Sequence, residues 1–321
     1  MRLKLGIVMD PIESIKTYKD SSFAMLLAAQ RRGWPLYYMQ QSDIYLRGAT
    51  AMAQASRIHV TDRTENWFNI EATETIELAS LNAILMRKDP PFDIEYISST
   101  YILEMAERDG CLVVNRPASL RDANEKMFIA HFPECCTPML VTRNTSLIRQ
   151  FIDEQGDVIV KPLDGMGGES IFRLTPSDPN TSVILETITH RGHKTIMVQR
   201  FIPEITKGDK RILLINGEPV PYALARIPAK GETRGNLAAG GSGLGIELTE
   251  RDHWICQQVG PRLREMGILF AGIDVIGDYL TEINITSPTC IRELDKQFNL
   301  DIAGQLMDCI EIQISSHRRP Q

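Results

Sequence analysis

Residues 157–172 read DVIVKPLDGMGGESIF, and the rest of the fold is predicted outward from them. Residues 158–160 are β-branched strand formers, and Lys161-Pro162 end the strand because proline has no N–H for the ladder. The glycines at 165–168 allow consecutive backbone N–H groups to turn inward, as they do in loops that hold phosphate. A lysine on a strand beside such a turn therefore indicates a clamp for a nucleotide phosphate.

The residues after the glycines exclude two common phosphate loops. Residues 170–174 are β-formers and are predicted to be the second strand of a hairpin. The Walker loop and the dinucleotide fingerprint both open a helix instead. On this stretch alone, a plain hairpin turn with a solvated lysine is as good an interpretation as a phosphate clamp.

The composition is that of a globular protein of two or three domains, with 321 residues of which 43% are hydrophobic. The net charge of −6 gives no support to a nucleic acid or an anionic membrane as partner. The six cysteines include no C-x-x-C pair, which argues against a zinc site and a disulfide framework and predicts a cytoplasmic setting. No apolar run is long enough to cross a membrane.

Strands and helices are predicted to alternate in the first part of the chain. The strands are expected at 4–9, 36–39, 83–86 and 112–114, and the helices at 21–32 and 94–108. Because these apolar runs have no exposed face, they favour an open parallel sheet covered on both sides. Residues 43–79 are less regular and are predicted as a hairpin or an excursion beyond the sheet edge.

Ligands of open parallel sheets bind at the carboxyl ends of the strands, and one such end carries Arg87 and Lys88 before two prolines. Arg87 directly follows a buried strand and could hold a substrate carboxylate with two parallel hydrogen bonds. A capped strand with an exposed charge pair is the alternative.

A helix at 119–132 is predicted from Ser119 and Asp122, whose spacing is a helix start signal. We place the first domain boundary there, which gives three predicted domains: 1–122, 123–200 and 201–321. The third begins with a hairpin around Asn216-Gly217.

Residues 227–245 contain six glycines and no apolar periodicity, which favours a lid over a disordered surface loop. Arg234 and Asn236 are flanked by glycines that could bring them onto a bound anion.

A second hairpin, 268–275 with 279–285, places three oxygen-bearing side chains near one another. A two-residue loop would pair Asp274 with Thr281, whereas a three-residue loop would set Asp274 opposite Glu282. Opposed carboxylates need a cation between them, and with Asn284 they would suit Mg²⁺. Alternatively, Asp274 caps the strand and Glu282 is exposed.

The segment that leaves this hairpin, SPTCIR at 287–292, is rich in small hydrogen-bonding side chains and could cradle a small polar substrate. Cys290 is more plausible as a packing residue than as a nucleophile, because no histidine lies near it in sequence.

In this order, the segments resemble the ATP-grasp superfamily and, more closely, the bacterial glutathione synthetases. The resemblance covers nearly the whole chain and is most specific at LMRKDPPFD, GETRGNLAAGG and TEINITSPTCIRE. It implies an α/β fold of ATP-grasp architecture, with an N-terminal open parallel-sheet domain, a central α+β ATP-lid domain and a C-terminal, mostly antiparallel domain.

The resemblance also implies roles for individual residues. The ATP-binding set is Lys126, Lys161, Gly165, Met166, Gly167, Gly168, Gln199, Arg200, Phe201, Ile202 and Asp209. The catalytic set is Arg211, Arg226, Arg234 and Asn236, and the metal ligands are Asp274, Glu282 and Asn284. The substrate-binding set is Arg87, Ser287, Thr289, Cys290 and Arg292. Arg200-Phe201-Ile202 departs from the asparagine, tyrosine and leucine of the family, so the first two side-chain roles stay open.

The reaction implied by the resemblance joins γ-glutamylcysteine to glycine through an acyl phosphate and releases ADP and phosphate. Mg²⁺ is the expected metal, with Mn²⁺ as a substitute, and a cytoplasmic homotetramer is the expected assembly. Two rival functions remain at this stage. One is another ATP-grasp ligase acting on a different acid and amine, and the other is an ATP-binding sensor without turnover.

Overall fold

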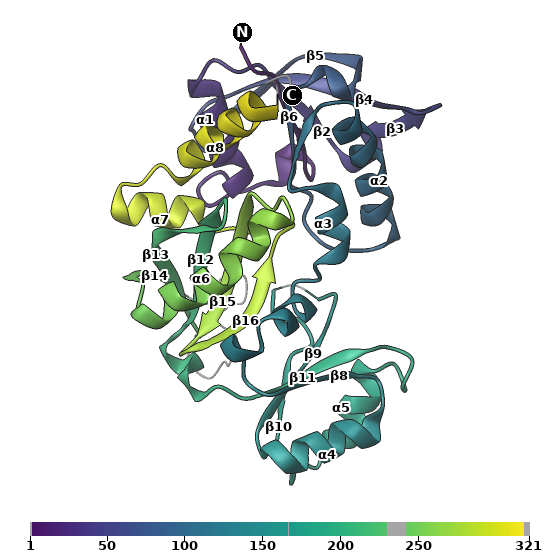
Figure 1. Ribbon diagram of the computed structural model, residues 1–321, viewed down its shortest axis with the longest axis vertical. Helices are drawn as coiled ribbons and strands as arrows, with labels where there is room; N and C mark the ends of the chain where they lie inside the picture. The colour runs from purple at the N-terminus through teal and green to yellow at the C-terminus, as the bar shows by residue number, and fades with distance from the viewer. Residues whose placement is uncertain (1, 166, 230–241, 318–321) are drawn as a thin grey trace.

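Three sheets organise the computed structural model, which describes residues 2–165, 167–229 and 242–317 (Figure 1). In the view of Figure 1 the seven-stranded N-terminal sheet lies at the top, the five-stranded C-terminal sheet in the middle and the four-stranded central sheet at the bottom. The prediction of an α/β fold is confirmed.

The N-terminal sheet has a parallel centre whose strands run in the order β2-β1-β6-β7. Its elements are β1 (Leu5–Val8), β2 (Leu36–Met39), β6 (Ala83–Met86) and β7 (Leu112–Val114), with α1 (Ser21–Arg31) and α2 (Ile94–Arg108). Each helix starts where an aspartate accepts a backbone N–H: Asp20 from Phe23 and Asp93 from Tyr96. The predicted alternation of strands and helices is confirmed.

This sheet was predicted to be parallel, but it is mixed. The excursion expected at 43–79 forms β3 (Ile44–Arg47), β4 (Thr50–Val60) and β5 (Phe68–Glu77), and β4 runs antiparallel to β2. The alanines at 51, 53 and 55 of β4 are buried while Gln54 is exposed. Such a one-sided pattern suits an antiparallel extension with one solvated face.

The predicted continuous helix at 119–132 is wrong. The structure has a short helix α3 (Pro117–Asp122), a break, and a 3₁₀ turn η4 (Met127–His131). The Ser119 hydroxyl donates to the carbonyl of Met266 and does not cap a helix. In the break, the Asn124 side chain accepts from the backbone N–H groups of Lys126 and Met127, which offers the chain an alternative to helical bonds.

The central sheet has both its helices on one face (Figure 1). Its elements are β8 (Met139–Thr142), β9 (Val158–Pro162), β10 (Phe172–Leu174), β11 (Ile196–Arg200), α4 (Thr145–Gln155) and α5 (Thr181–Ile188). Val158 and Val160 pack into the core with Ile148 of α4. Because side chains alternate along a strand, Ile159 and Lys161 of β9 point to the opposite face.

The C-terminal sheet is antiparallel throughout and has the order β14-β13-β12-β15-β16. Its strands are β12 (Asp209–Ile215), β13 (Glu218–Ile227), β14 (Ser242–Glu247), β15 (Phe270–Ile276) and β16 (Tyr279–Asn284). The helices of this part are α6 (Glu250–Glu265), α7 (Ile291–Phe298) and α8 (Ile302–His317), of which α8 returns to lie along α1 (Figure 1). The end of the predicted 227–245 loop is thus strand β14, paired with β13.

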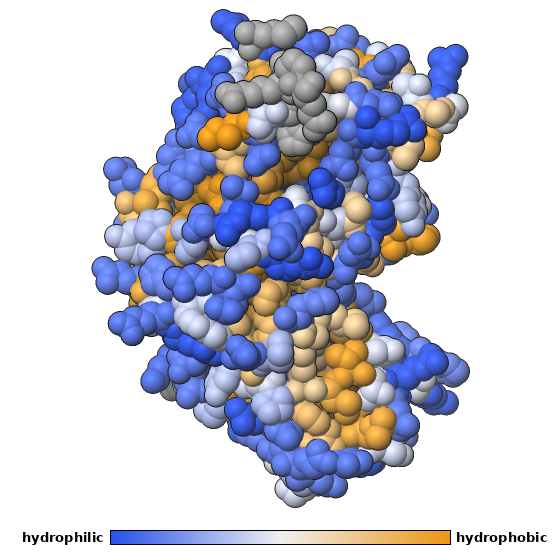
Figure 2. Space-filling model, viewed as in Figure 1, coloured by the Kyte–Doolittle hydropathy of each residue, from blue (hydrophilic) through white to orange (hydrophobic). Residues whose placement is uncertain are grey.

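Hydrophilic residues cover most of the face shown in Figure 2, and the hydrophobic ones lie there in separate patches. Within the described residues, every helix is too short or too polar to cross a lipid bilayer.

Two glycines set how closely α6 approaches the sheet. A Cβ on Gly260 of α6 would lie 2.1 Å from the carbonyl oxygen of Gly217, in the turn between β12 and β13. Alanine for glycine inside a helix normally stabilises by roughly 0.5–1 kcal/mol. Here we expect the opposite sign: Gly260→Ala should lower the free energy of unfolding by about 1–3 kcal/mol through overpacking.

Thermal melting of Gly260→Ala beside the wild type measures this effect. Gln257→Ala is the matched control, because Gln257 is exposed on the same helix. A Gly260→Ala protein that melts at or above the wild-type temperature would contradict the tight contact.

Candidate active site

The hairpin of β15 and β16 sets Asp274 opposite Glu282, but not by the predicted route. Ile276 pairs with Tyr279 and Val275 with Leu280, so the turn has the two residues Gly277-Asp278. That turn alone would pair Asp274 with Thr281. A β-bulge between Asp274 and Val275 shifts the register by one residue on β16, and the Thr281 hydroxyl donates to the Asp274 carbonyl at 3.1 Å.

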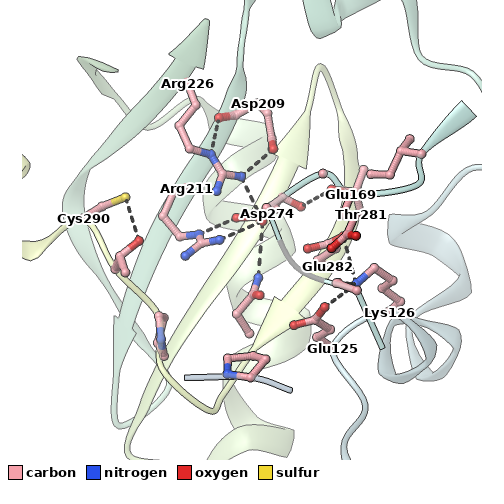
Figure 3. A pocket seen from close by; sticks show the side chains of 18 of the residues that line it. Glu125, Lys126, Glu169, Asp209, Arg211, Arg226, Asp274, Thr281, Glu282 and Cys290 are labelled. Atoms are coloured by element: carbon pink, nitrogen blue, oxygen red, sulfur yellow. Dashed lines mark hydrogen bonds and ion pairs between the residues drawn. The ribbon is translucent and has the colours of Figure 1, made fainter. Parts of the chain in front are cut away.

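Two arginines from neighbouring strands hold the Asp274 carboxylate (Figure 3). Arg211 of β12 lies opposite Asp274 in register and donates from Nε and from a terminal nitrogen, the latter at 2.9 Å. Arg226 of β13 reaches it at 2.9 Å and also pairs with Asp209. Burial alone would raise the pKa of Asp274, but the two arginines lower it to about 2. Asp274 is therefore ionised at neutral pH and faces two cations.

Two buried lysines lie beside Glu282 in the cavity. The ammonium groups of Lys126 and Lys161 both lie 3.8 Å from Glu282 Oε1. Lys161 donates to the Thr281 carbonyl at 3.3 Å, and Lys126 donates to the Gly165 carbonyl at 2.7 Å. Burial lowers the pKa of Lys161. The glycine hairpin (residues 158–174) and the Asp274–Glu282 ribbon (the hairpin of β15 and β16) thus meet at one place. This proximity favours the phosphate clamp over the plain hairpin turn.

A cavity of about 520 Å³ runs between these groups. It is lined by most of the residues predicted to bind ATP, metal and substrate: Lys126, Lys161, Gly165, Gly167, Gly168, Gln199, Arg200, Phe201, Ile202, Asp209, Arg211, Arg226, Asp274, Glu282, Asn284, Ser287, Thr289 and Cys290. Met166, Arg234 and Asn236 lie outside the described residues. Burial raises the pKa of Cys290, so its thiol stays protonated and suits packing better than nucleophilic attack.

Four isoleucines are among the residues that line the cavity: Ile159, Ile171, Ile202 and Ile276. Apolar lining of this kind suits the flat face of a nucleobase. Arg200 and Phe201, the linker residues that differ from those of the family, pack against neighbouring side chains. The Arg173 guanidinium lies 3.9 Å over the Phe201 ring, and the Arg200 guanidinium lies 5.9 Å from the Tyr279 ring centre.

Arg87 and Arg292 do not line the cavity, although both were predicted to bind substrate. Arg87 is 5% exposed and donates to the Ser22 hydroxyl at 3.0 Å and to the Pro288 carbonyl at 2.9 Å. Arg292 pairs with Asp62. In this structure Arg87 therefore bonds to the 287–290 segment at Pro288, and two of its N–H groups are used within the protein.

The charged residues that line the cavity but are absent from the predicted sets include Lys19, Glu125 and Glu293. Glu125 could have been predicted from the sequence, because it directly precedes Lys126, which was predicted to bind ATP. Lys19 precedes α1 and Glu293 lies on α7, and no motif or spacing connects two residues so far apart in the chain. One carboxylate oxygen of Glu293 is buried and has no hydrogen-bond partner among the described residues.

The pH dependence of stability should report on Asp209. Burial raises the pKa of Asp209 from 3.8 to about 7, against the opposing effect of Arg226. Between these values the folded protein binds more protons than the unfolded chain, so the free energy of unfolding falls as pH rises. Asp209→Asn removes this fall, and its melting temperature relative to wild type should therefore increase from pH 5 to pH 8.

Melting curves at pH 5, 6, 7 and 8 measure this difference. Asp153→Asn, at an exposed site on α4, is the control and should show no such trend. A constant difference between Asp209→Asn and wild type would rule out the raised pKa.

Comparison with known proteins identifies the family. Residues 3–121 match the model of the prokaryotic glutathione synthetase N-terminal domain, and residues 125–299 match that of the prokaryotic glutathione synthetase ATP-grasp domain. This chain belongs to the prokaryotic glutathione synthetase family. Glutathione synthetase from Pseudomonas putida is 62% identical over 97% of this chain and 98% of that protein. The enzyme of the same name from Vibrio cholerae is 57% identical over 96% and 97%.

Solved structures confirm the ATP-grasp fold of this glutathione synthetase family member. D-cycloserine synthetase DcsG aligns with a TM-score of 0.68 at 13% identity, covering 97% of this chain and 99% of that one. The ATP-grasp ligase PsnB aligns with a TM-score of 0.63 at 16% identity, covering 97% and 98%. With its family established, the chain is an ATP-dependent ligase.

Proposed function

We propose that this chain makes glutathione by joining γ-glutamylcysteine to glycine, with ATP converted to ADP and phosphate through an acyl phosphate. The observation that carries the proposal is the single cavity in which the Lys161 hairpin and the Asp274–Glu282 ribbon meet. Family membership supports the choice of substrates.

The proposed chemistry needs positioned charge and no protein nucleophile. A carboxylate is too poor an electrophile for an amine, so the γ-phosphate is first passed to the cysteinyl carboxylate, and glycine then displaces phosphate. Phosphoryl transfer asks the protein mainly for position and charge neutralisation. In this proposal Lys126 and Lys161 hold phosphate, while Arg211 and Arg226 hold the carboxylate that accepts it.

The side chains on the ribbon fit Mg²⁺ as a partner of the nucleotide. Asp274 is ionised, Glu282 lies directly opposite, and Asn284 shares the face of Glu282 by the strand period. Among the described residues, no group of three or more Asp, Glu, His or Cys side chains is arranged to hold a metal by itself. Mg²⁺ commonly takes one or two carboxylates and completes its shell with water and phosphate. Bound there, it would neutralise charge on the transferred phosphoryl group.

Two charged residues that line the cavity suit the amino-acid head of the acid substrate. Lys19 offers a cation, and Glu293 offers a buried carboxylate oxygen that lacks a protein partner among the described residues. A free α-carboxylate and α-amino group would satisfy both. Ser287 and Thr289 also line the cavity.

ADP release measured with each substrate alone and with both together tests the proposal. We expect turnover only when ATP, γ-glutamylcysteine and glycine are all present, with glutathione formed in equal amount to ADP. A panel of other acids and amines, including paired D-alanine, is the control. Faster turnover with another pair would assign the chain to a different ligase activity, and no turnover with any pair would favour the sensor.

We further propose that the protein works in the cytoplasm as a homotetramer. All six cysteines are free thiols, as a reducing compartment requires. The tetramer rests on the family resemblance, and light scattering coupled to size exclusion measures it directly.

A further inference from the structure

Glu125 is a cavity carboxylate that has no role in the proposed chemistry. It lies in the break between α3 and η4, directly before Lys126, and its side chain is 20% exposed. Its carboxylate accepts a very short hydrogen bond from the Lys126 ammonium (Figure 3). A residue with this contact bears directly on how Lys126 meets a ligand.

The backbone around Glu125 is tied to both halves of the site. The Glu125 carbonyl accepts from the N–H of Ile283 on β16 at 2.8 Å. The neighbouring Asn124 side chain donates to the Leu163 carbonyl, at the end of β9, at 3.0 Å. These bonds hold Glu125 where the ribbon and the glycine hairpin meet, so its carboxylate stays beside Lys126.

The two lysines of the site differ in how their charge is used. An ammonium group has three donors. Lys126 gives one to Glu125 and one to Gly165, whereas the nearest carboxylate oxygen to Lys161 belongs to Glu282 and lies 3.8 Å away. Lys126 therefore carries its own counter-ion within the protein, and Lys161 is the cation that is freer to meet a phosphate.

We propose that Glu125 competes with nucleotide phosphate for Lys126, so that it weakens the hold on the nucleotide and favours release of ADP. The inference rests on the proposed function. A phosphate that reaches Lys126 must approach the Glu125 carboxylate, which already accepts from the same ammonium group. In a largely buried cavity this repulsion is screened much less than it would be at the surface.

Calorimetric titration of ADP in the absence of divalent cations tests the proposal, because the protein charges then act alone. Glu125→Gln removes the competing charge and should bind ADP roughly tenfold more tightly than the wild type. Glu125→Asp keeps the charge and should stay within about twofold. Glu186→Gln, at an exposed site on α5, is the matched control and should equal the wild type.

Equal or weaker binding by Glu125→Gln would overturn the proposal, since the carboxylate would then serve to orient Lys126. Glu125→Ala carries the same expectation as Glu125→Gln, and thermal melting checks that each variant is folded. A wild-type protein that binds ADP while the variants bind no more tightly refutes this inference alone. Failure of the wild type to bind ADP even after Mg²⁺ is added would refute the proposed function as well.

Discussion

Asp274→Asn is expected to lower kcat/KM for ATP by roughly 1,000-fold and to destabilise the fold by about 3–5 kcal/mol. Asp274 is 2% exposed and is the shared partner of Arg211 and Arg226. Without its charge, two guanidinium groups remain buried side by side, and among the described residues Asp209 is the only carboxylate still paired with either of them. The same change removes one of the oxygen ligands proposed for Mg²⁺.

Steady-state kinetics at several Mg²⁺ concentrations and thermal melting measure the two effects separately. Asp278→Asn is the matched control, because Asp278 is exposed in the turn of the same hairpin. Wild-type melting together with lost activity would mean that Asp274 acts on the ligand alone. If Asp274→Asn kept wild-type activity, the hairpin of β15 and β16 would not be part of the active site.

Lys161→Met should separate activity from stability. We expect affinity for ATP to fall by roughly 100-fold, because the cation that is freer to meet a phosphate is lost. Stability should stay equal or rise. Lys161 is 5% exposed, burial lowers its pKa, and its ammonium group donates to the Thr281 carbonyl at 3.3 Å, so a charged group is held in the interior at a cost.

Binding of a non-hydrolysable ATP analogue and thermal melting measure the two quantities on the same preparations. Lys207→Met, at an exposed position, controls for loss of a positive charge. A variant that melts well below the wild type would show that Lys161 has a structural role. A variant that binds the analogue as tightly as the wild type would contradict the proposal that Lys161 holds a nucleotide phosphate.

Local sequence signals located most of the elements because they are short apolar runs between strong stops. Strand β6 ends before the charged Arg87, and α2 begins after Asp93, whose side chain caps it. The failure at 119–132 has a tertiary cause. Asn124 bonds to Leu163, and Glu125 bonds to Ile283, and these distant partners override local helix propensity.

The candidate site divides in the same way. The lysine beside its glycines and the carboxylates of the β15–β16 hairpin are visible in the sequence, because each belongs to a local pattern. The bulge that sets Asp274 opposite Glu282 is not visible, since turn length alone predicts the other pairing. Arg87 had a local signal for substrate binding, but the fold brings the Ser22 hydroxyl and the Pro288 carbonyl to its guanidinium.

By itself, the sequence determined the order of strands and helices, the family resemblance and which chemical groups are present, since these depend on neighbours along the chain. Only the tertiary structure decided which charges face one another: Asp274 with Arg211 and Arg226, and Glu125 with Lys126. Charge pairing in a buried cavity depends on distance and on exclusion of water. Both are set by strand register and by contacts between segments far apart in the chain.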